Sequence, residues 1–179
     1  FKHERDQIKQ CKKLLEKIKK ENKNFISKNQ KMLDILWFLD YELNNRFKFV
    51  KRFIGNTKYL DHTLIFFKTL NSVINSINLL EIRGRDSLGL MLSINLKKNN
   101  ENIFWIKENL KSRNYIKINK NNIIVNVIYK NCNIFGSLGD NSKVILKKIK
   151  NDHAILKLLK SGLYESINIV AHTRWASVG

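Results

Sequence analysis

The end of the chain carries side chains suited to binding a small acid. In the segment His172-Thr173-Arg174-Trp175-Ala176-Ser177, a permanent cation and a large aromatic ring stand among small hydroxyl residues. A mostly apolar run, 167–170, precedes them and predicts a buried strand, and loops at strand ends often display binding residues. The planar guanidinium of Arg174 matches the two oxygens of a carboxylate. These residues alone therefore predict a pocket for a small carboxylic acid.

Three segments resemble sequence blocks of one enzyme family. Residues 172–179 resemble a His-Thr-Arg-Trp-Ala signature, and residues 80–89 are similar to a Leu-Glu-Tyr-Arg-Gly-Tyr-Asp-Ser-Ala-Gly block. Both belong to the class II glutamine amidotransferases. The segment Ser137-Leu138-Gly139-Asp140 is a weaker match to a short turn before a helix. Within the family, the blocks look most like those of the glutamine–fructose-6-phosphate aminotransferases, also called glucosamine-6-phosphate synthases. The resemblance covers about residues 60–179 and none of residues 1–55.

The resemblance implies substrate contacts for three residues. In the family, the Arg of the signature binds the α-carboxylate of glutamine, and Arg174 matches it. The Trp beside it shapes the loop that closes over the glutamine, and Trp175 matches that residue. Ser177 stands where the family usually has a Thr that contacts the substrate. Val178 replaces the usual His, so this chain departs from the family at one polar contact of the pocket.

Four further residues of the blocks are expected to support the pocket without contacting glutamine. Arg83 and Asp86 belong to the block that supports the wall behind the nucleophile, and His172 and Thr173 precede the arginine. His172, at a strand end, is expected to be a structural histidine rather than an acid or base. Without the resemblance, Arg174 would be expected to pair with a structural carboxylate. Three glycines are expected to serve backbone geometry rather than phosphate binding: Gly84, Gly89 and Gly179.

The family's nucleophile has no match in this chain. It is an N-terminal Cys whose own amino group activates the thiol, whereas Phe1 opens this chain and neither Cys11 nor Cys132 fits the pattern. The family's oxyanion-stabilising Asn-Gly pair follows the signature block. We therefore expect a fragment that contains no catalytic residue and is inactive alone.

For the full protein, the resemblance implies a glutaminase that supplies ammonia. L-Glutamine would be hydrolysed, and the ammonia would convert fructose 6-phosphate to glucosamine 6-phosphate at a domain outside this chain. The resemblance implies a homo-oligomer and no metal or organic cofactor. Another acceptor is possible, because the glutaminase part does not define it.

The strong positive charge raises a different hypothesis. The chain has 34 Lys and Arg against 15 Asp and Glu, a net charge of +19, which is typical of nucleic-acid-binding modules. However, the lysines are spread along the chain and accompany many Asn and Ile residues, as an AT-rich coding sequence would produce. We therefore expect no nucleic-acid partner. A nucleic-acid-binding module and a catalytically inactive binding or regulatory protein of the same fold stay open as alternatives.

Cysteine, hydropathy and histidine patterns bear on the compartment, on membrane spans and on metal binding. Two widely separated cysteines do not form a disulfide framework, so a cytoplasmic location is expected. No run approaches the roughly 18 apolar residues of a membrane span, and no membrane partner is expected. The histidines show no metal-ligand spacing: His3, His62, His153 and His172.

The first part of the chain, residues 1–57, is expected to form a helical hairpin inserted into the domain. Apolar residues recur at steps of three and four within 3–20 and again within 30–53, which predicts two helices. Residues 22–29 are largely polar and predict the connecting loop. A solvated structural appendage is the expected role, with a docking or oligomerisation surface as the alternative.

The second part, residues 58–179, is expected to be a partial glutaminase domain of α+β class. We predict a helix capped by Asp61 or Thr63 and ended by Gly84, and a second helix capped by Asp140 or Asn141 that continues to Leu159. Alternating or continuous apolar residues predict strands at 88–96, 116–118, 123–129 and 167–172, with a polar turn at 97–101. This order suits the αββα sandwich of N-terminal nucleophile hydrolases that the resemblance implies.

Overall fold

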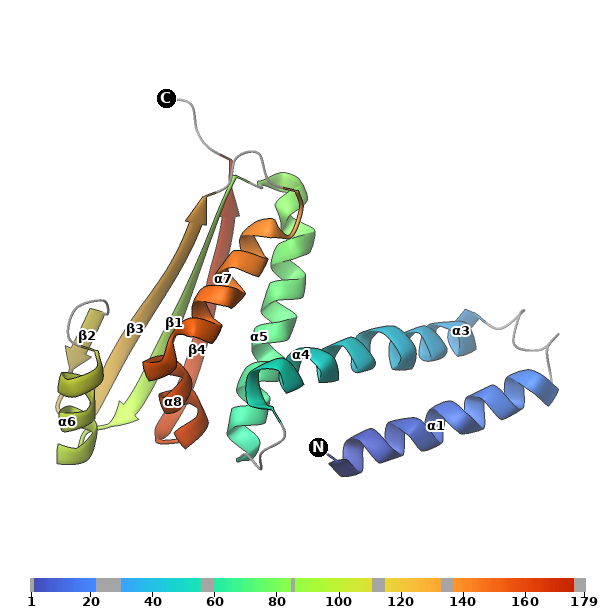
Figure 1. Ribbon diagram of the computed structural model, residues 1–179, viewed down its shortest axis with the longest axis horizontal. Coiled ribbons are helices and arrows are strands. Elements are labelled where there is room, and N and C mark those ends of the chain that lie inside the picture. Colours follow the sequence, from blue (N-terminus) through green and yellow to red (C-terminus); the bar gives the residue numbers. More distant parts are fainter. Residues whose placement is uncertain are drawn as a thin grey trace. The chain divides into compact units, whose positions relative to one another are not determined.

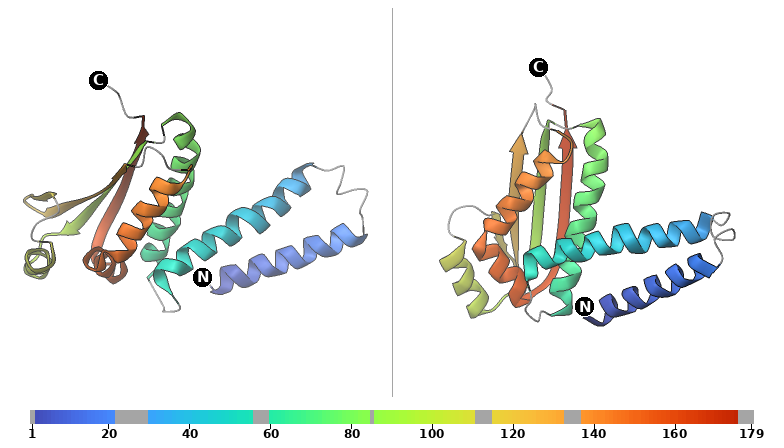
Figure 2. Two further views of the ribbon diagram at one scale, coloured as in Figure 1. Left: turned by 45° about the horizontal axis from the view of Figure 1, so that its top comes forward. Right: turned by 45° about the vertical axis from the view of Figure 1, so that its right-hand side comes forward.

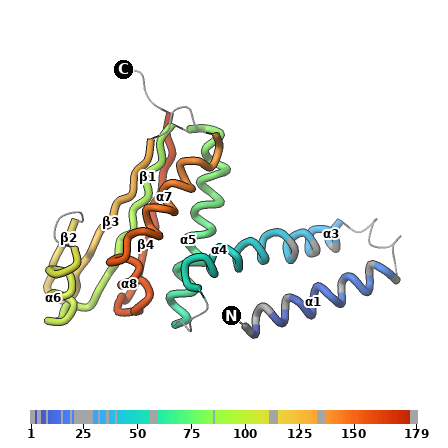
Figure 3. The backbone as a smooth tube through the Cα atoms, in the orientation of Figure 1, coloured from blue at the N-terminus to red at the C-terminus, as the bar shows by residue number. Residues whose placement is uncertain are grey.

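The structure, a computed structural model, describes residues 2–21, 30–55, 60–84, 86–110, 115–132 and 137–175 (Figure 3). The chain divides into two compact units, Phe1–Arg52 and Phe53–Gly179. Seven α-helices and four strands, with one π-helical and one 3-10 segment, make up the regular structure of the described residues (Figure 1). No helix in these ranges is both long and apolar enough to cross a membrane.

The first unit is helical, as its apolar periodicity predicts. Helix α1 (Lys2–Glu21) is followed by α3 (Gln30–Trp37), the π-helical segment η1 (Phe38–Leu43) and α4 (Asn44–Ile54). The last three form one uninterrupted helical path, because the junction residues Trp37 and Asn44 both keep right-handed helical backbone angles. The predicted helices at 3–20 and 30–53 are therefore confirmed. The predicted loop at 22–29 lies outside the described residues.

The second unit contains one antiparallel sheet in the strand order β2-β3-β1-β4. Its strands are β1 (Ser87–Lys97), β2 (Tyr115–Ile118), β3 (Asn122–Cys132) and β4 (Tyr164–Arg174). Its helical elements are α5 (Asp61–Leu80), η2 (Glu81–Arg83), α6 (Asn100–Asn109), α7 (Asp140–Asn151) and α8 (His153–Ser161). The expected α+β class is confirmed.

One face of the sheet is buried under helices. Along β1 and β3 every second side chain is apolar and buried, which is the two-residue period of a strand with one covered face: Leu88, Leu90, Leu92, Ile94, Leu96, Ile123, Val125, Val127 and Tyr129. Helices α5, α7 and α8 lie over this face (Figure 2). Their own buried apolar side chains complete the core: Phe66, Phe67, Leu70, Ile74, Ile77, Ile145, Ile149, Ile155, Leu158 and Leu159.

Two predicted segments differ from the structure. The single helix predicted from 140 to 159 is broken at Asp152, whose backbone angles (φ −85, ψ 81) are not helical. The Asp152 carboxylate accepts hydrogen bonds from the Tyr129 hydroxyl at 3.2 Å and from the Ile155 N–H at 3.3 Å, so it caps α8. The predicted polar turn at 97–101 is shorter in the structure, because Lys97 ends β1 and α6 begins at Asn100. The Asn99 side chain caps this helix by accepting from the Asn102 N–H at 2.7 Å.

The predicted cap of α5 is also wrong. Leu60 occupies the N-cap position and makes no side-chain hydrogen bond there. Thr63 is fully buried, and its hydroxyl donates to the Leu159 carbonyl at 3.1 Å. This threonine therefore joins α5 to α8 rather than capping its own helix.

Two isoleucines test the buried face of the sheet. Ile94 in β1 is 0% exposed, whereas Ile118 in β2 is 56% exposed. We expect Ile94→Ala to lower the free energy of unfolding by about 2–5 kcal/mol, because it leaves a cavity in the core. Ile118→Ala, the matched control, should cost less than about 1 kcal/mol. Urea unfolding of the full chain measures both, and equal losses would contradict this assignment of the core.

Candidate functional site

The pairing of β1 with β4 brings together the two blocks that carry the family resemblance. In this antiparallel pair Ser87 lies opposite Arg174, Leu88 opposite Thr173 and Gly89 opposite His172. Segments that are far apart in the sequence therefore meet at one end of the sheet.

Two glycines allow this close approach. A β-carbon on Gly84 would lie 2.9 Å from the Arg174 Cα, and one on Gly89 would lie 2.5 Å from the His172 Cε1. Gly84 has an extended backbone (φ 179), so space rather than conformation requires glycine there. Both glycines are thus required for space, at Gly84 by the backbone of Arg174 and at Gly89 by the His172 ring, whereas Gly179 lies outside the described residues.

Arg174 and His172 share the sheet face that α5, α7 and α8 do not cover. Directly opposite residues of an antiparallel pair point to the same face, and the intervening Leu88 is 1% exposed in the helix-covered core. Thr173, opposite Leu88, is half-buried, whereas Arg174 and His172 are exposed. Arg174 is the last residue of β4 rather than part of a following loop.

Arg174 makes no ion pair with any other residue that the structure describes. The alternative that it pairs with a structural carboxylate therefore has no support within these ranges.

The other predicted residues differ in exposure. Trp175, which follows Arg174, is 54% exposed. Of the two supporting residues in the block at 80–89, Arg83 is exposed on η2, whereas Asp86 is only 7% exposed. Ser177 lies outside the described residues.

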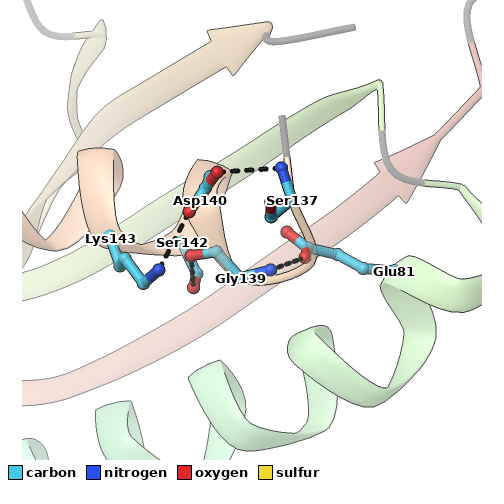
Figure 4. A network of polar contacts seen from close by, with 6 residues as sticks. All are labelled: Glu81, Ser137, Gly139, Asp140, Ser142 and Lys143. Atoms are coloured by element: carbon cyan, nitrogen blue, oxygen red, sulfur yellow. Dashed lines mark hydrogen bonds and ion pairs between the residues drawn. The ribbon is translucent and has the colours of Figure 1, made fainter. Parts of the chain in front are cut away.

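A buried carboxylate joins the block at residues 80–89 to the block at residues 137–140 (Figure 4). Glu81 is 1% exposed, and its Oε2 accepts a hydrogen bond from the Gly139 N–H. Gly139 is the N-cap of α7 and has a left-handed backbone (φ 84) that favours glycine. The negative charge thus lies at the positive end of the helix dipole. Glu81 was not among the predicted site residues, although a lone acid after Leu79-Leu80 is a usable signal.

Neither predicted cap, Asp140 or Asn141, occupies the N-cap position of α7, which is Gly139. Asp140 instead makes polar contacts within the turn at 137–140. The Asp140 carboxylate accepts from the Ser137 N–H at 2.8 Å and from the Lys143 ammonium at 2.9 Å. These contacts, the one to Lys143 first, lower the pKa of Asp140 below its ordinary value of 3.8. Asn141 instead is buried and accepts from the Asn131 side chain at 2.7 Å.

The described residues offer no metal centre, since no three His, Cys, Asp or Glu side chains among them are grouped to hold an ion. Both cysteines are free and exposed. Cys132 ends β3 and lies opposite Ser87, on the other side of β1 from Arg174.

Comparisons of the chain with protein-family models, with curated proteins and with solved structures find no match in any of the three.

Alanine substitutions test the two close approaches. Gly84→Ala should lower the free energy of unfolding by about 1–3 kcal/mol, because its new methyl group meets backbone that cannot move aside. Gly89→Ala should also destabilise the protein, but in a His172→Ala background most of that loss should vanish. The loss from Gly84→Ala should be the same in both backgrounds. Denaturant unfolding of the variants forms a double-mutant cycle, and a rescue of Gly84→Ala by His172→Ala would contradict the geometry.

Asp140 gives a prediction for pH. Its pKa is lower in the folded chain than the ordinary 3.8, so its charged form contributes stability above pH 3.8 that is lost as the pH falls through the folded-state value. Asp140→Asn keeps an acceptor for the Ser137 N–H and removes the charge. We expect this variant to have the lower Tm near pH 6, with the difference shrinking below pH 3.8. A constant difference across this range would show that the charge is not responsible.

Proposed function

We propose that the chain is the glutamine-binding part of a class II glutamine amidotransferase, with Arg174 as the residue that holds the α-carboxylate of glutamine. One observation carries the proposal: Ser87 and Arg174 are register partners, so two sequence blocks that resemble the same family meet at one sheet end. A chance resemblance in two separate segments gives no reason for them to meet.

The exposure of Arg174 supports a role in binding an external anion. An arginine that served only the fold would be expected to have a carboxylate partner, and none of the described residues pairs with Arg174. Its five N–H donors can bind both oxygens of an α-carboxylate. The exposed ring of Trp175 is next in sequence and is proposed to shape the loop over the bound glutamine. Ser177 is proposed to add a hydroxyl contact.

The remaining block residues are proposed to set the position of Arg174. Gly84 permits the close approach of its backbone, and Gly89 gives room for the His172 ring on the same face. Glu81 joins the segment before β1 to the N-terminus of α7. Arg83, Asp86 and Thr173 are proposed to act through this framework without touching glutamine.

The proposal also includes a specific fold, the αββα sandwich. The described unit has one sheet with helices over one face. In an αββα sandwich of the N-terminal nucleophile hydrolase type, a second sheet would pack against the opposite face, which here displays Met91, Ile128 and Val170 together with Arg174. Glutamine would then bind between the sheets at the end marked by Arg174.

The proposed reaction of the full protein is glutamine hydrolysis by an N-terminal cysteine. The thiolate attacks the side-chain amide carbon, hydrogen-bond donors stabilise the oxyanion, and ammonia leaves. Water then releases glutamate from the thioester. The ammonia is proposed to convert fructose 6-phosphate to glucosamine 6-phosphate, in a cytoplasmic homo-oligomeric enzyme without a metal or organic cofactor.

Substitution of Arg174 tests the proposal. In the full protein, Arg174→Ala should raise the KM for glutamine roughly 100-fold or more, because it leaves the substrate carboxylate without its charged partner. Arg174→Lys should be intermediate, since an ammonium lacks the planar fork. Glutaminase kinetics with glutamine as the varied substrate measure both effects.

Arg52→Ala is the charge-matched control, because Arg52 is an exposed arginine of the first unit, and it should leave the KM unchanged. Unchanged kinetics in Arg174→Ala would remove the central assignment. Glutamine binding without hydrolysis would favour the inactive binding protein. Binding of nucleic acid at low ionic strength, with no glutamine binding, would favour the basic module.

A further inference from the structure

Strand β3 has an edge that β2 covers only in part. β3 pairs with β1 along its whole length, from Asn122 to Cys132, but β2 pairs with it only from Ile123 to Asn126. In Figure 1 the β2 arrow accompanies only the lower part of β3. From Val127 onward, no strand of the described residues pairs with this edge of β3.

The backbone groups on this edge can be assigned. Around the β2–β3 turn the Asn122 carbonyl accepts from the Asn119 N–H on the β2 side, whereas the Asn121 carbonyl accepts from the Lys98 N–H beyond β1. Successive residues of a strand direct their backbone N–H and C=O groups to opposite edges. The backbone groups of the even-numbered residues of β3 therefore point away from β1. The Lys130 carbonyl confirms this pattern, since it accepts from the Lys148 ammonium of α7. Ile128 therefore also presents its N–H and carbonyl on the open edge.

A groove of about 540 Å³ runs between this edge and α7. Its strand side is 127–130, and its helix side carries Val144, Lys147, Lys148 and Asn151 before ending at Asp152. Three lysines line it, at positions 130, 147 and 148, against the single carboxylate of Asp152. That carboxylate already accepts two hydrogen bonds. The groove thus combines a net positive charge with the N–H and carbonyl of Ile128, which no strand of the described residues pairs.

We infer that this groove is a docking site for an extended acidic segment of a partner protein, which adds as a strand to the open edge of β3 beside α7. Main-chain hydrogen bonds to Ile128 and Lys130 would supply affinity, which is how peptides are recognised by strand addition. The inference uses none of the residues assigned to glutamine.

The side chains around the groove define the sequence that fits it. Successive side chains of an added strand point alternately toward the helix-covered face and toward the opposite face. On the helix side they meet Lys147 and Lys148, which favours carboxylates. On the opposite side they meet Ile128, which is 50% exposed and favours an apolar residue. A segment of alternating acidic and apolar residues therefore complements the groove. A nucleic-acid strand has the charge, but its sugar-phosphate backbone carries no N–H donors for the Ile128 carbonyl.

A fluorescein-labelled short peptide of alternating Glu and Val, titrated into the full chain by anisotropy, tests the inference. We expect Lys147→Glu together with Lys148→Glu to weaken binding at least about tenfold, because attraction becomes repulsion. Lys107→Glu together with Lys157→Glu is the matched control, since these exposed lysines lie on α6 and α8 outside the groove, and it should leave the affinity within about twofold. Circular dichroism checks that both variants are folded.

The backbone is tested separately. The same peptide with alternate amides N-methylated keeps its charge but loses the donors of a strand, and it should not bind. Addition of the unmodified peptide should slow hydrogen exchange at the amides of Ile128 and Lys130. Equal binding of the methylated peptide, equal weakening by both lysine pairs, or preferential binding of an oligonucleotide would overturn the inference. No binding at all would do so too, and would show that Lys148 merely covers the edge.

Discussion

The close approach of two backbone segments, at Gly84 and at Arg174, fixes the geometry of the rest of the site. A β-carbon at Gly84 would fall 2.9 Å from the Arg174 Cα, so the end of β4 lies against the segment entering β1 only because no side chain intervenes. The register that pairs Arg174 with Ser87 places Arg174 on the face that the helices do not cover. The His172 ring, which lies over Gly89 on the same face, depends on the same register.

The buried carboxylate of Glu81 extends this constraint to the helical layer. A buried charge is costly unless it is paired or hydrogen-bonded, and Glu81 has the Gly139 N–H and the N-terminus of α7 as compensation. Its other oxygen, Oε1, has no hydrogen-bond partner among the described residues. The junction therefore links α5, α7 and the beginning of β1 through one side chain, at the end of the sheet that carries Arg174.

Local patterns predicted most elements, and non-local contacts explain the differences. The alternating leucines of β1 and the broad apolar face of α5 are strong signals, and both elements are present. Helix α6 was missed because it is mostly polar and only Asn102 and Ile106 are buried in it. The break at Asp152 depends partly on Tyr129, a partner from another element. The residues of the candidate site were proposed from a resemblance, but their meeting across β1 and β4 depends on strand register, which no single segment encodes.

The row of residues Cys132, Ser87 and Arg174 crosses three neighbouring strands at the same level. Strands of a sheet lie about 4.8 Å apart, so the Cys132 sulfur lies on the order of 10 Å from Arg174. This thiol is free and exposed, and the only other cysteine, Cys11, belongs to the first unit. A spin label or an environment-sensitive fluorophore on Cys132, in a Cys11→Ser background, would thus be a spectroscopic reporter beside the site, with no new attachment point engineered into the sheet.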